Sequence, residues 1–150
     1  MIKKGIKHFI AIETTGLSDS DEILQKVDLI YNADNDEIIN MQNSYYNPES
    51  TVTVPTKYCH ILDIFAKNIC HNPSHSIAYK DAEIIVFDDV FADKFIYGAK
   101  TSIRSLVKEK YSLNRRKPSL AKCLELTHID LPLYDCIDKA VALLEIYKSL

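Results

Sequence analysis

Short apolar runs separated by polar turns dominate the first third of the chain. The run over residues 6–12 is apolar enough for a buried strand, and residues 22–31 alternate between apolar and polar positions as a second strand does. The turn cluster NADNDE leads into a third strand over residues 37–46, which ends at Asn47-Pro48. The pattern therefore predicts a meander of three antiparallel strands.

The remainder of the chain combines one strand with helices. The apolar run AEIIVF, residues 82–87, predicts a short interior strand. Helical segments are predicted over residues 56–69, 90–97, 101–111, 118–126 and 134–150. In the last of them, one apolar face is formed by Ile137, Val141, Leu144 and Tyr147. Strands first, then strand and helix mixed, predict a single α/β domain over residues 1–150 with a mixed sheet.

Composition is consistent with this domain, because 47% of the residues are hydrophobic, as in folded globular chains. No apolar run reaches the length needed to cross a bilayer. The apolar part of the start, MIKKGIKHFI, is too short for a signal peptide and no small-residue cleavage site follows. We therefore expect a cytoplasmic protein with no membrane association.

The cysteines indicate free thiols in a reducing compartment, because the four of them contain no C-x-x-C pair. They are Cys59, Cys70, Cys123 and Cys136. Metal-ligand residue types do gather at Cys59, His60, Cys70, His71 and His75. However, Pro73 separates the last two, and the spacing matches no zinc pattern. We expect loop or core residues here rather than a zinc site.

Positive charge is concentrated in one stretch, although the net charge of the chain is −3. Residues 94–122 hold nine positive residues and one acid, whereas the rest holds nine positive residues and 20 acids. Lys100, Arg104 and Lys108 recur every four residues, which predicts one basic helix face. Two interpretations stay open: a footprint for phosphate backbones, or a solvated helix face followed by a charged loop.

The stretch IAIETTGL places an acid, Glu13, directly after the first buried strand, and Gly16 permits a tight turn behind it. Carboxylate oxygens are the ligands that Mg²⁺ and Mn²⁺ prefer. Further acids follow later in the chain, at Asp88, Asp89, Asp93, Asp135 and Asp138. Acids that converge at one end of a sheet meet the requirement for two-metal phosphoryl chemistry, with metals roughly 3.5–4 Å apart.

These residues carry a resemblance to a known family. FIAIETTGL resembles the first motif of the DEDD-type (DnaQ-like) 3′–5′ exonucleases, which reads Asp-x-Glu-Thr-Thr-Gly-Leu. Resemblance to the family's later segments follows in the same order, in DEILQKVDLIYN, YYNPESTVTVP, AEIIVFDDVFADKFI, PSLAKCLEL and YDCIDKAVALLEIY. It covers the whole chain and implies a ribonuclease-H-like fold, in which helices flank a mixed β-sheet.

The resemblance implies roles for four residues in metal-dependent hydrolysis. Glu13 and Asp138 would hold Mg²⁺ or Mn²⁺, and Asp93 would be a supporting acid. Tyr134 lies four residues before Asp138, as in the branch of the family that uses a tyrosine to orient the attacking water. The implied reaction is 3′–5′ removal of nucleotides from single-stranded DNA or short RNA.

Substrate and partner contacts are expected on the same basis. Thr15 and Leu17 would contact the 3′-terminal nucleotide. Positive side chains near the site would hold the single strand, and the candidates are Arg104, Lys108, Arg115 and Arg116. The resemblance also allows a homodimer or a polymerase-type partner.

Three departures from the family pattern bear on activity. Ala11 stands where the family has its first Asp, and Asp88-Asp89 stands where it usually has His-Asn. No histidine precedes Asp138, and an alignment without a gap puts Lys139 at the final acid, where it would repel a cation.

Several alternatives therefore stay open. Ala11 is either an engineered change in an active exonuclease or part of a natural, inactive pseudo-exonuclease. The inactive protein would serve as a nucleic-acid-binding module or as a protein-interaction subunit. Without the resemblance, Glu13 would be a turn acid, and Asp93 and Asp138 would be first-turn helix acids.

Overall fold

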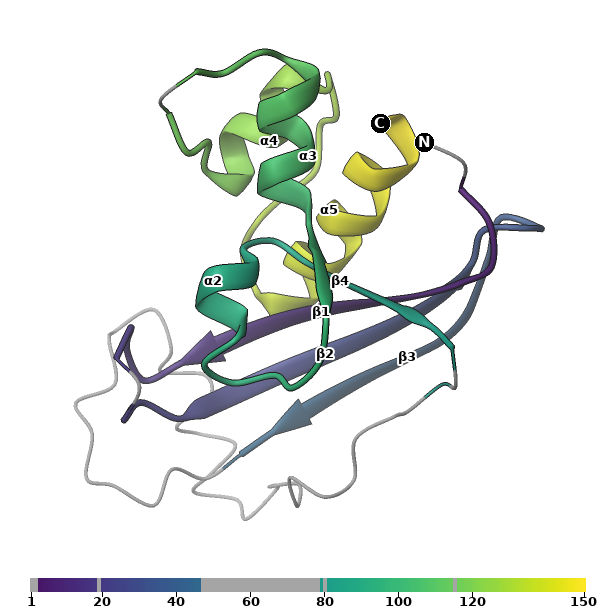
Figure 1. The fold of residues 1–150 in the computed structure, drawn as a ribbon. Helices are drawn as coiled ribbons and strands as arrows, with labels where there is room; N and C mark the ends of the chain where they lie inside the picture. Colours follow the sequence, from purple (N-terminus) through teal and green to yellow (C-terminus); the bar gives the residue numbers. More distant parts are fainter. Residues whose placement is uncertain (1–2, 19, 47–78, 80, 115) are drawn as a thin grey trace.

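The computed structural model describes residues 3–18, 20–46, 79, 81–114 and 116–150. Its centre is a five-stranded mixed sheet with the strand order β3-β2-β1-β4-β5 (Figure 1). The strands are β1 (Ile6–Thr14), β2 (Ile23–Asn32), β3 (Glu37–Tyr45), β4 (Glu83–Val86) and β5 (Lys100–Ser102). The predicted α/β class with a mixed sheet is confirmed.

The first three strands form the predicted antiparallel meander. β1 pairs with β2 from Ile6 opposite Asn32 to Thr14 opposite Ile23, and β2 pairs with β3 in the same antiparallel sense. β4 lies parallel to β1, and β5 lies parallel to β4. The β1–β2 register shifts between Glu13 and Thr14. Such irregularities change the direction in which side chains point. Glu13, the acid of the first motif, therefore lies where the regular pairing ends.

Four helices follow within the part of the chain that the structure describes. They are α2 (Asp89–Ala92), α3 (Ile103–Lys110), α4 (Leu120–Leu126) and α5 (Cys136–Ser149). Each begins after a residue whose side chain accepts a hydrogen bond from a first-turn amide: Asp88, Ser102, Ser119 and Asp135. Among these described helices, none combines the length and apolar character that crossing a membrane requires.

One helix prediction is corrected by the cap of α3. The Ser102 side chain accepts a hydrogen bond from the Ser105 amide, so α3 begins only at Ile103. Lys100 belongs to β5 instead, and it does not share a helix face with Arg104 and Lys108. The predicted basic stripe of three residues is therefore wrong at its first position.

Helix α5 covers one face of the sheet and forms most of the core with it. It packs against β1 and β2, and the Tyr147 ring meets the Phe9 ring edge-on with centroids 5.4 Å apart (Figure 1). A smaller cluster of Ile10, Val86 and Ala92 buries the inner side of α2 against the sheet. Since Ile10 belongs to this cluster and Phe9 to the main core, β1 contributes to both.

Two of the cysteines lie in this core as free thiols. Cys123 and Cys136 are buried, and burial raises the pKa of the Cys123 thiol to about 11. The predicted helix over residues 56–69 lies outside the described residues. So do the cysteine and histidine residues between Cys59 and His75.

Candidate functional site

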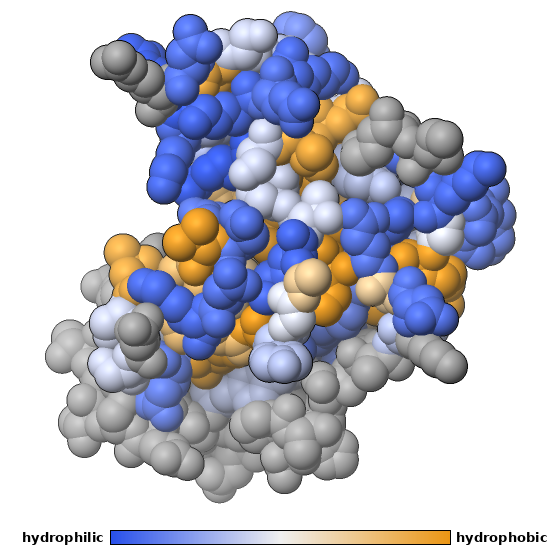
Figure 2. Space-filling model, viewed as in Figure 1, coloured by the Kyte–Doolittle hydropathy of each residue, from blue (hydrophilic) through white to orange (hydrophobic). Residues whose placement is uncertain are grey.

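A pocket of about 330 Å³ lies where β1 and β4 end. Mostly apolar side chains line it, from the β1 end and its turn (Ile10, Ala11, Ile12, Glu13, Thr14, Leu17), the β4–α2 segment (Val86, Phe87, Asp88, Phe91, Ala92, Ile96), α4 (Leu120) and α5 (Lys139, Leu143). Figure 2 shows a hollow in the outline between α4 and α2, with mainly hydrophilic atoms above it and hydrophobic atoms beside α2. An apolar pocket with a few polar groups is typical of a small-ligand site.

The turn after β1 is fixed by one carboxylate, that of Asp21. It accepts hydrogen bonds from the Ser18 amide (2.8 Å), the Ser18 hydroxyl (2.7 Å) and the Thr15 hydroxyl (2.8 Å). The Ser18 and Thr15 hydrogen bonds hold the pKa of Asp21 below its usual value. A Cβ at Gly16 would lie 2.5 Å from an Asp21 carboxylate oxygen, so glycine permits this close approach.

An ion pair joins the motif acid to the last helix. The Lys139 ammonium, in the first turn of α5, donates a hydrogen bond to Glu13 Oε1. The Glu13 side chain is only 9% exposed, whereas that of Lys139 is 34% exposed. Ala11 lines the same pocket two residues before Glu13 and contributes no charge. The single acid of the β1 end is therefore neutralised by an ammonium group of the chain itself.

Asp88, the second acid of the pocket, is also neutralised. It caps α2 by accepting from the Val90 amide (3.1 Å), and it pairs with the Arg104 guanidinium at 2.6 Å. Arg104 lies over the Phe87 ring at 4.5 Å and donates to the Pro118 carbonyl oxygen at 3.0 Å. Arg104 thus ties α3 and the segment before α4 to the pocket wall.

The predicted acids at residues 93 and 138 do not meet Glu13. Asp93 is exposed and pairs with Lys100 at 2.7 Å, while its neighbour Ala92 lines the pocket. Asp138 accepts a hydrogen bond from the Tyr134 amide at 2.9 Å, close to the start of α5. Tyr134 itself is 91% exposed. Glu13 is the only one of these four residues that lines the pocket.

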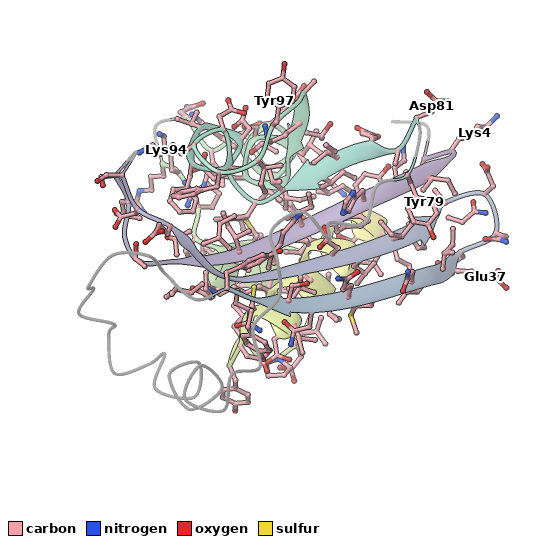
Figure 3. The ribbon with its side chains drawn as sticks, turned by 90° about the horizontal axis from the view of Figure 1, so that it is seen from below. Lys4, Glu37, Tyr79, Asp81, Lys94 and Tyr97 are labelled. Carbon is pink, nitrogen blue, oxygen red and sulfur yellow. The ribbon has the colours of Figure 1, made fainter. Side chains whose placement is uncertain are left out.

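The predicted nucleotide contacts have different surroundings. The Thr15 hydroxyl is engaged, because it donates to Asp21 and accepts from the Glu22 amide at 2.9 Å. Leu17 lines the pocket and is 75% exposed. Its carbonyl oxygen accepts a hydrogen bond of 2.5 Å from Lys94, which Figure 3 shows at the end of the sheet opposite Lys4 and Glu37.

The basic residues expected to hold the strand are not equivalent. Arg104 is already paired with Asp88, and Lys108 lies half-buried on α3. Arg116 is exposed in the segment before α4, and Arg115 lies outside the described residues.

The donor set of the pocket does not fit a divalent metal ion. Within the described residues, no group of three or more His, Cys, Asp or Glu side chains could hold one. Mg²⁺ and Mn²⁺ need several oxygen ligands, but the two pocket carboxylates are engaged by the cations of Lys139 and Arg104. A divalent ion beside Glu13 would also face the positive charge of Lys139.

Two residues of this arrangement, Lys139 and Ala92, are not evident as pocket residues from the sequence pattern. An alignment without a gap puts Lys139 at the family's final acid, and the structure pairs Lys139 with Glu13. The methyl side chain of Ala92 has no chemistry that marks it as a pocket residue. The sequence indicates only its neighbour, Asp93.

Comparison with known proteins supports the fold. No family model and no curated protein matches the sequence. Among solved structures, a full-length 3′-exonuclease matches with a TM-score of 0.74 at 14% identity, covering 97% of this chain and 60% of its own. The nuclease domain of 3′hExo, a DEDDh family member bound to rAMP, matches with a TM-score of 0.66 at 13% identity. That match covers 96% of this chain and 90% of the nuclease domain.

Cell-death related nuclease 4 (CRN-4) matches with a TM-score of 0.64 at 12% identity, covering 97% of this chain and 63% of its own. The chain thus spans about three fifths of the length of this nuclease and of the full-length 3′-exonuclease. These matches show the fold: the chain has the ribonuclease-H-like fold of DnaQ-type 3′-exonucleases, as the resemblance predicted.

Proposed function

We propose that this protein binds the 3′ end of single-stranded nucleic acid and does not hydrolyse it. The fold supports the binding half of the proposal. E. coli exonuclease I, which shares the fold at 13% identity with a TM-score of 0.70, has been solved in complex with a dT13 oligonucleotide. The 3′hExo nuclease domain has been solved bound to rAMP.

The Glu13–Lys139 ion pair is the observation that supports the second part of the proposal, that the protein does not hydrolyse the strand. Metal-dependent hydrolysis of a phosphodiester needs carboxylates that are free to ligate cations. Here the one acid retained from the first motif is held by an ammonium group, and Ala11 supplies no second carboxylate. An engineered change at residue 11 alone would leave Lys139 unexplained, so the proposal takes the chain as naturally inactive.

The volume and the apolar lining of the pocket support binding of the terminal nucleotide of a strand. A volume of about 330 Å³ suits one nucleotide, and the apolar lining suits the flat face of a base. Leu17 stands exposed at the wall of the pocket, where an apolar side chain can pack against a terminal base. Packing of this kind against a base is the same for DNA and RNA.

The test is fluorescence anisotropy with a 5′-fluorescein-labelled single strand, in EDTA and in Mn²⁺. We expect the same Kd in both buffers, since no step of binding uses a metal ion. Leu17→Ser should weaken binding by roughly fivefold, for the loss of about 1 kcal/mol of apolar contact. Val90→Ser is the matched control, because Val90 is 67% exposed but does not line the pocket.

Two results would contradict the proposal. Binding that appears only with Mn²⁺ would mean that the pocket recruits a metal ion despite Lys139. No binding at low salt would favour the alternative of a protein-interaction subunit.

A further inference from the structure

We propose that Lys139 is the ligand of a nucleotide phosphate in the pocket and supplies, without a metal ion, the positive charge that holds it. This inference rests on the proposed function and names the group of the nucleic acid that the pocket recognises. The pocket does not fit a metal ion, because Lys139 already neutralises Glu13 there.

The accessible charge of the ion pair is the positive one. The Lys139 side chain is 34% exposed and the Glu13 side chain is 9% exposed, so an entering anion meets the ammonium rather than the carboxylate. The remaining acid of the pocket, Asp88, is held by Arg104 at 2.6 Å. Ala11 and Ala92 line the same pocket with methyl groups and add no negative charge.

The Lys139 ammonium group also has N–H donors that the pair with Glu13 does not use. It carries three N–H groups, and one of them is used by Glu13 Oε1. With the other described residues the Lys139 side chain makes no further hydrogen bond. Lysine is an established type of phosphate ligand, and hydrogen bonds between ions are stronger than neutral ones. A phosphate next to Lys139 can therefore be bound while the pair with Glu13 persists.

The pocket then recognises two parts of one nucleotide. Apolar side chains such as Phe91 and Leu17 contact the base, and Lys139 contacts the phosphate. The ligand class that follows is a nucleoside 5′-monophosphate, either free or as the terminal unit of a strand. The uncharged nucleoside lacks the group that Lys139 binds.

Isothermal titration calorimetry of the whole chain with adenosine 5′-monophosphate and with adenosine, both in EDTA, tests this directly. We expect the monophosphate to bind roughly tenfold more tightly than the nucleoside, the size of one charge-assisted contact. Lys139→Met should remove this preference and leave the affinity for adenosine unchanged. Lys139→Arg should retain the preference because it keeps the charge.

Two further variants separate a phosphate ligand from a merely structural lysine. Glu13→Gln removes the competing carboxylate, so it should tighten binding of the monophosphate and not of adenosine. Lys148→Met is the matched control, because Lys148 also lies on α5, is 35% exposed and pairs with an acid, Asp36 at 3.0 Å. It should change neither affinity. If Lys139→Met is too unstable to measure, the double variant Glu13→Gln/Lys139→Met removes both charges and carries the same expectation.

The inference is overturned if the monophosphate and the nucleoside bind equally, if neither binds, or if the preference survives Lys139→Met. Its failure is distinguishable from that of the proposed function, because metal-independent binding of the labelled oligonucleotide would then persist. Loss of oligonucleotide binding as well would overturn both.

Discussion

Glu13 and Lys139 are separated by 126 positions in the sequence, yet they form one ion pair in the pocket. The carboxylate is nearly buried, and a buried charge without a partner is costly. The ammonium offsets that cost and keeps part of its own surface in water. The pair therefore leaves neither charge without a partner and determines which charge faces the pocket.

Removing one partner should destabilise the protein more than removing both. We expect Lys139→Met to lower the free energy of unfolding by about 1–3 kcal/mol, because Glu13 is left buried beside a methionine. The double variant Glu13→Gln/Lys139→Met should recover part of that loss. Urea denaturation of both single variants and the double variant measures the coupling. Additive effects of the two changes would show that the pair contributes nothing.

The sequence predicts some of these residues and not others. Glu13 is found because it follows an apolar strand and precedes a glycine turn, a local pattern. A local pattern does not show which of Ala92 and Asp93 lines the pocket. Adjacent helix residues face different directions, and the residue at which α2 begins depends on its cap, Asp88. The pairing of Lys139 with Glu13 depends on how α5 docks on β1, which is a tertiary property.

At the scale of elements, the start of α5 is held by two carboxylates. Asp135 accepts a hydrogen bond from the Asp138 amide at 2.8 Å, and Asp138 accepts one from the Tyr134 amide at 2.9 Å. Both acids lie near the positive end of the helix dipole. These contacts explain why an acid occupies residue 138 without reference to a metal ion.

Asp138→Ala should therefore affect stability and leave binding unchanged. We expect a loss of about 0.5–1 kcal/mol in the free energy of unfolding, the usual effect of a lost cap or first-turn acid. Glu145→Ala, in the same helix, is the control and should have a smaller effect, because Glu145 makes only a 3.7 Å ion pair with Lys148. Weaker oligonucleotide binding by Asp138→Ala at unchanged stability would instead place Asp138 in the site.

The longer strands were predictable from a local sequence pattern, whereas the shortest strand was not. The strands β1, β2 and β3, of nine or ten residues each, were anticipated from their apolar pattern. β5 has only three residues, too few to show an alternating pattern in the sequence, and Thr101 and Ser102 fall within the helix predicted over residues 101–111. Its existence depends on pairing with β4, which no local pattern reports.

Across the whole molecule, several positive residues of the basic stretch, residues 94–122, form ion pairs with acids of the protein itself. Lys100, Arg104 and Lys122 pair with Asp93, Asp88 and Glu125 respectively. Within the described residues, Lys108, Arg116 and Lys117 form no ion pair and stay available for a phosphate backbone. Lys100, Arg104 and Lys122 are therefore engaged within the protein, and a footprint for a phosphate backbone stays a prediction for Lys108, Arg116 and Lys117.

Salt dependence of oligonucleotide binding should report this division. Each phosphate contact to a single strand contributes about −0.7 to the slope of log K against log salt concentration. Arg116→Gln/Lys117→Gln should make the slope less steep by up to about 1.4, two such contacts. Lys122→Gln is the control and should leave the slope nearly unchanged, because Lys122 is paired with Glu125 at 2.6 Å. An unchanged slope in the double variant would show that the strand does not cross the segment before α4.

We propose that the pocket holds an ammonium group where hydrolysis would need metal ions, so that the protein does not cut the strand it binds. To test this claim, a 5′-labelled single strand is incubated with the unaltered protein and Mn²⁺ and resolved on a denaturing gel. We predict that the strand stays intact at protein concentrations that bind it fully. A ladder of products shortened stepwise from the 3′ end, and abolished by EDTA, would contradict the claim.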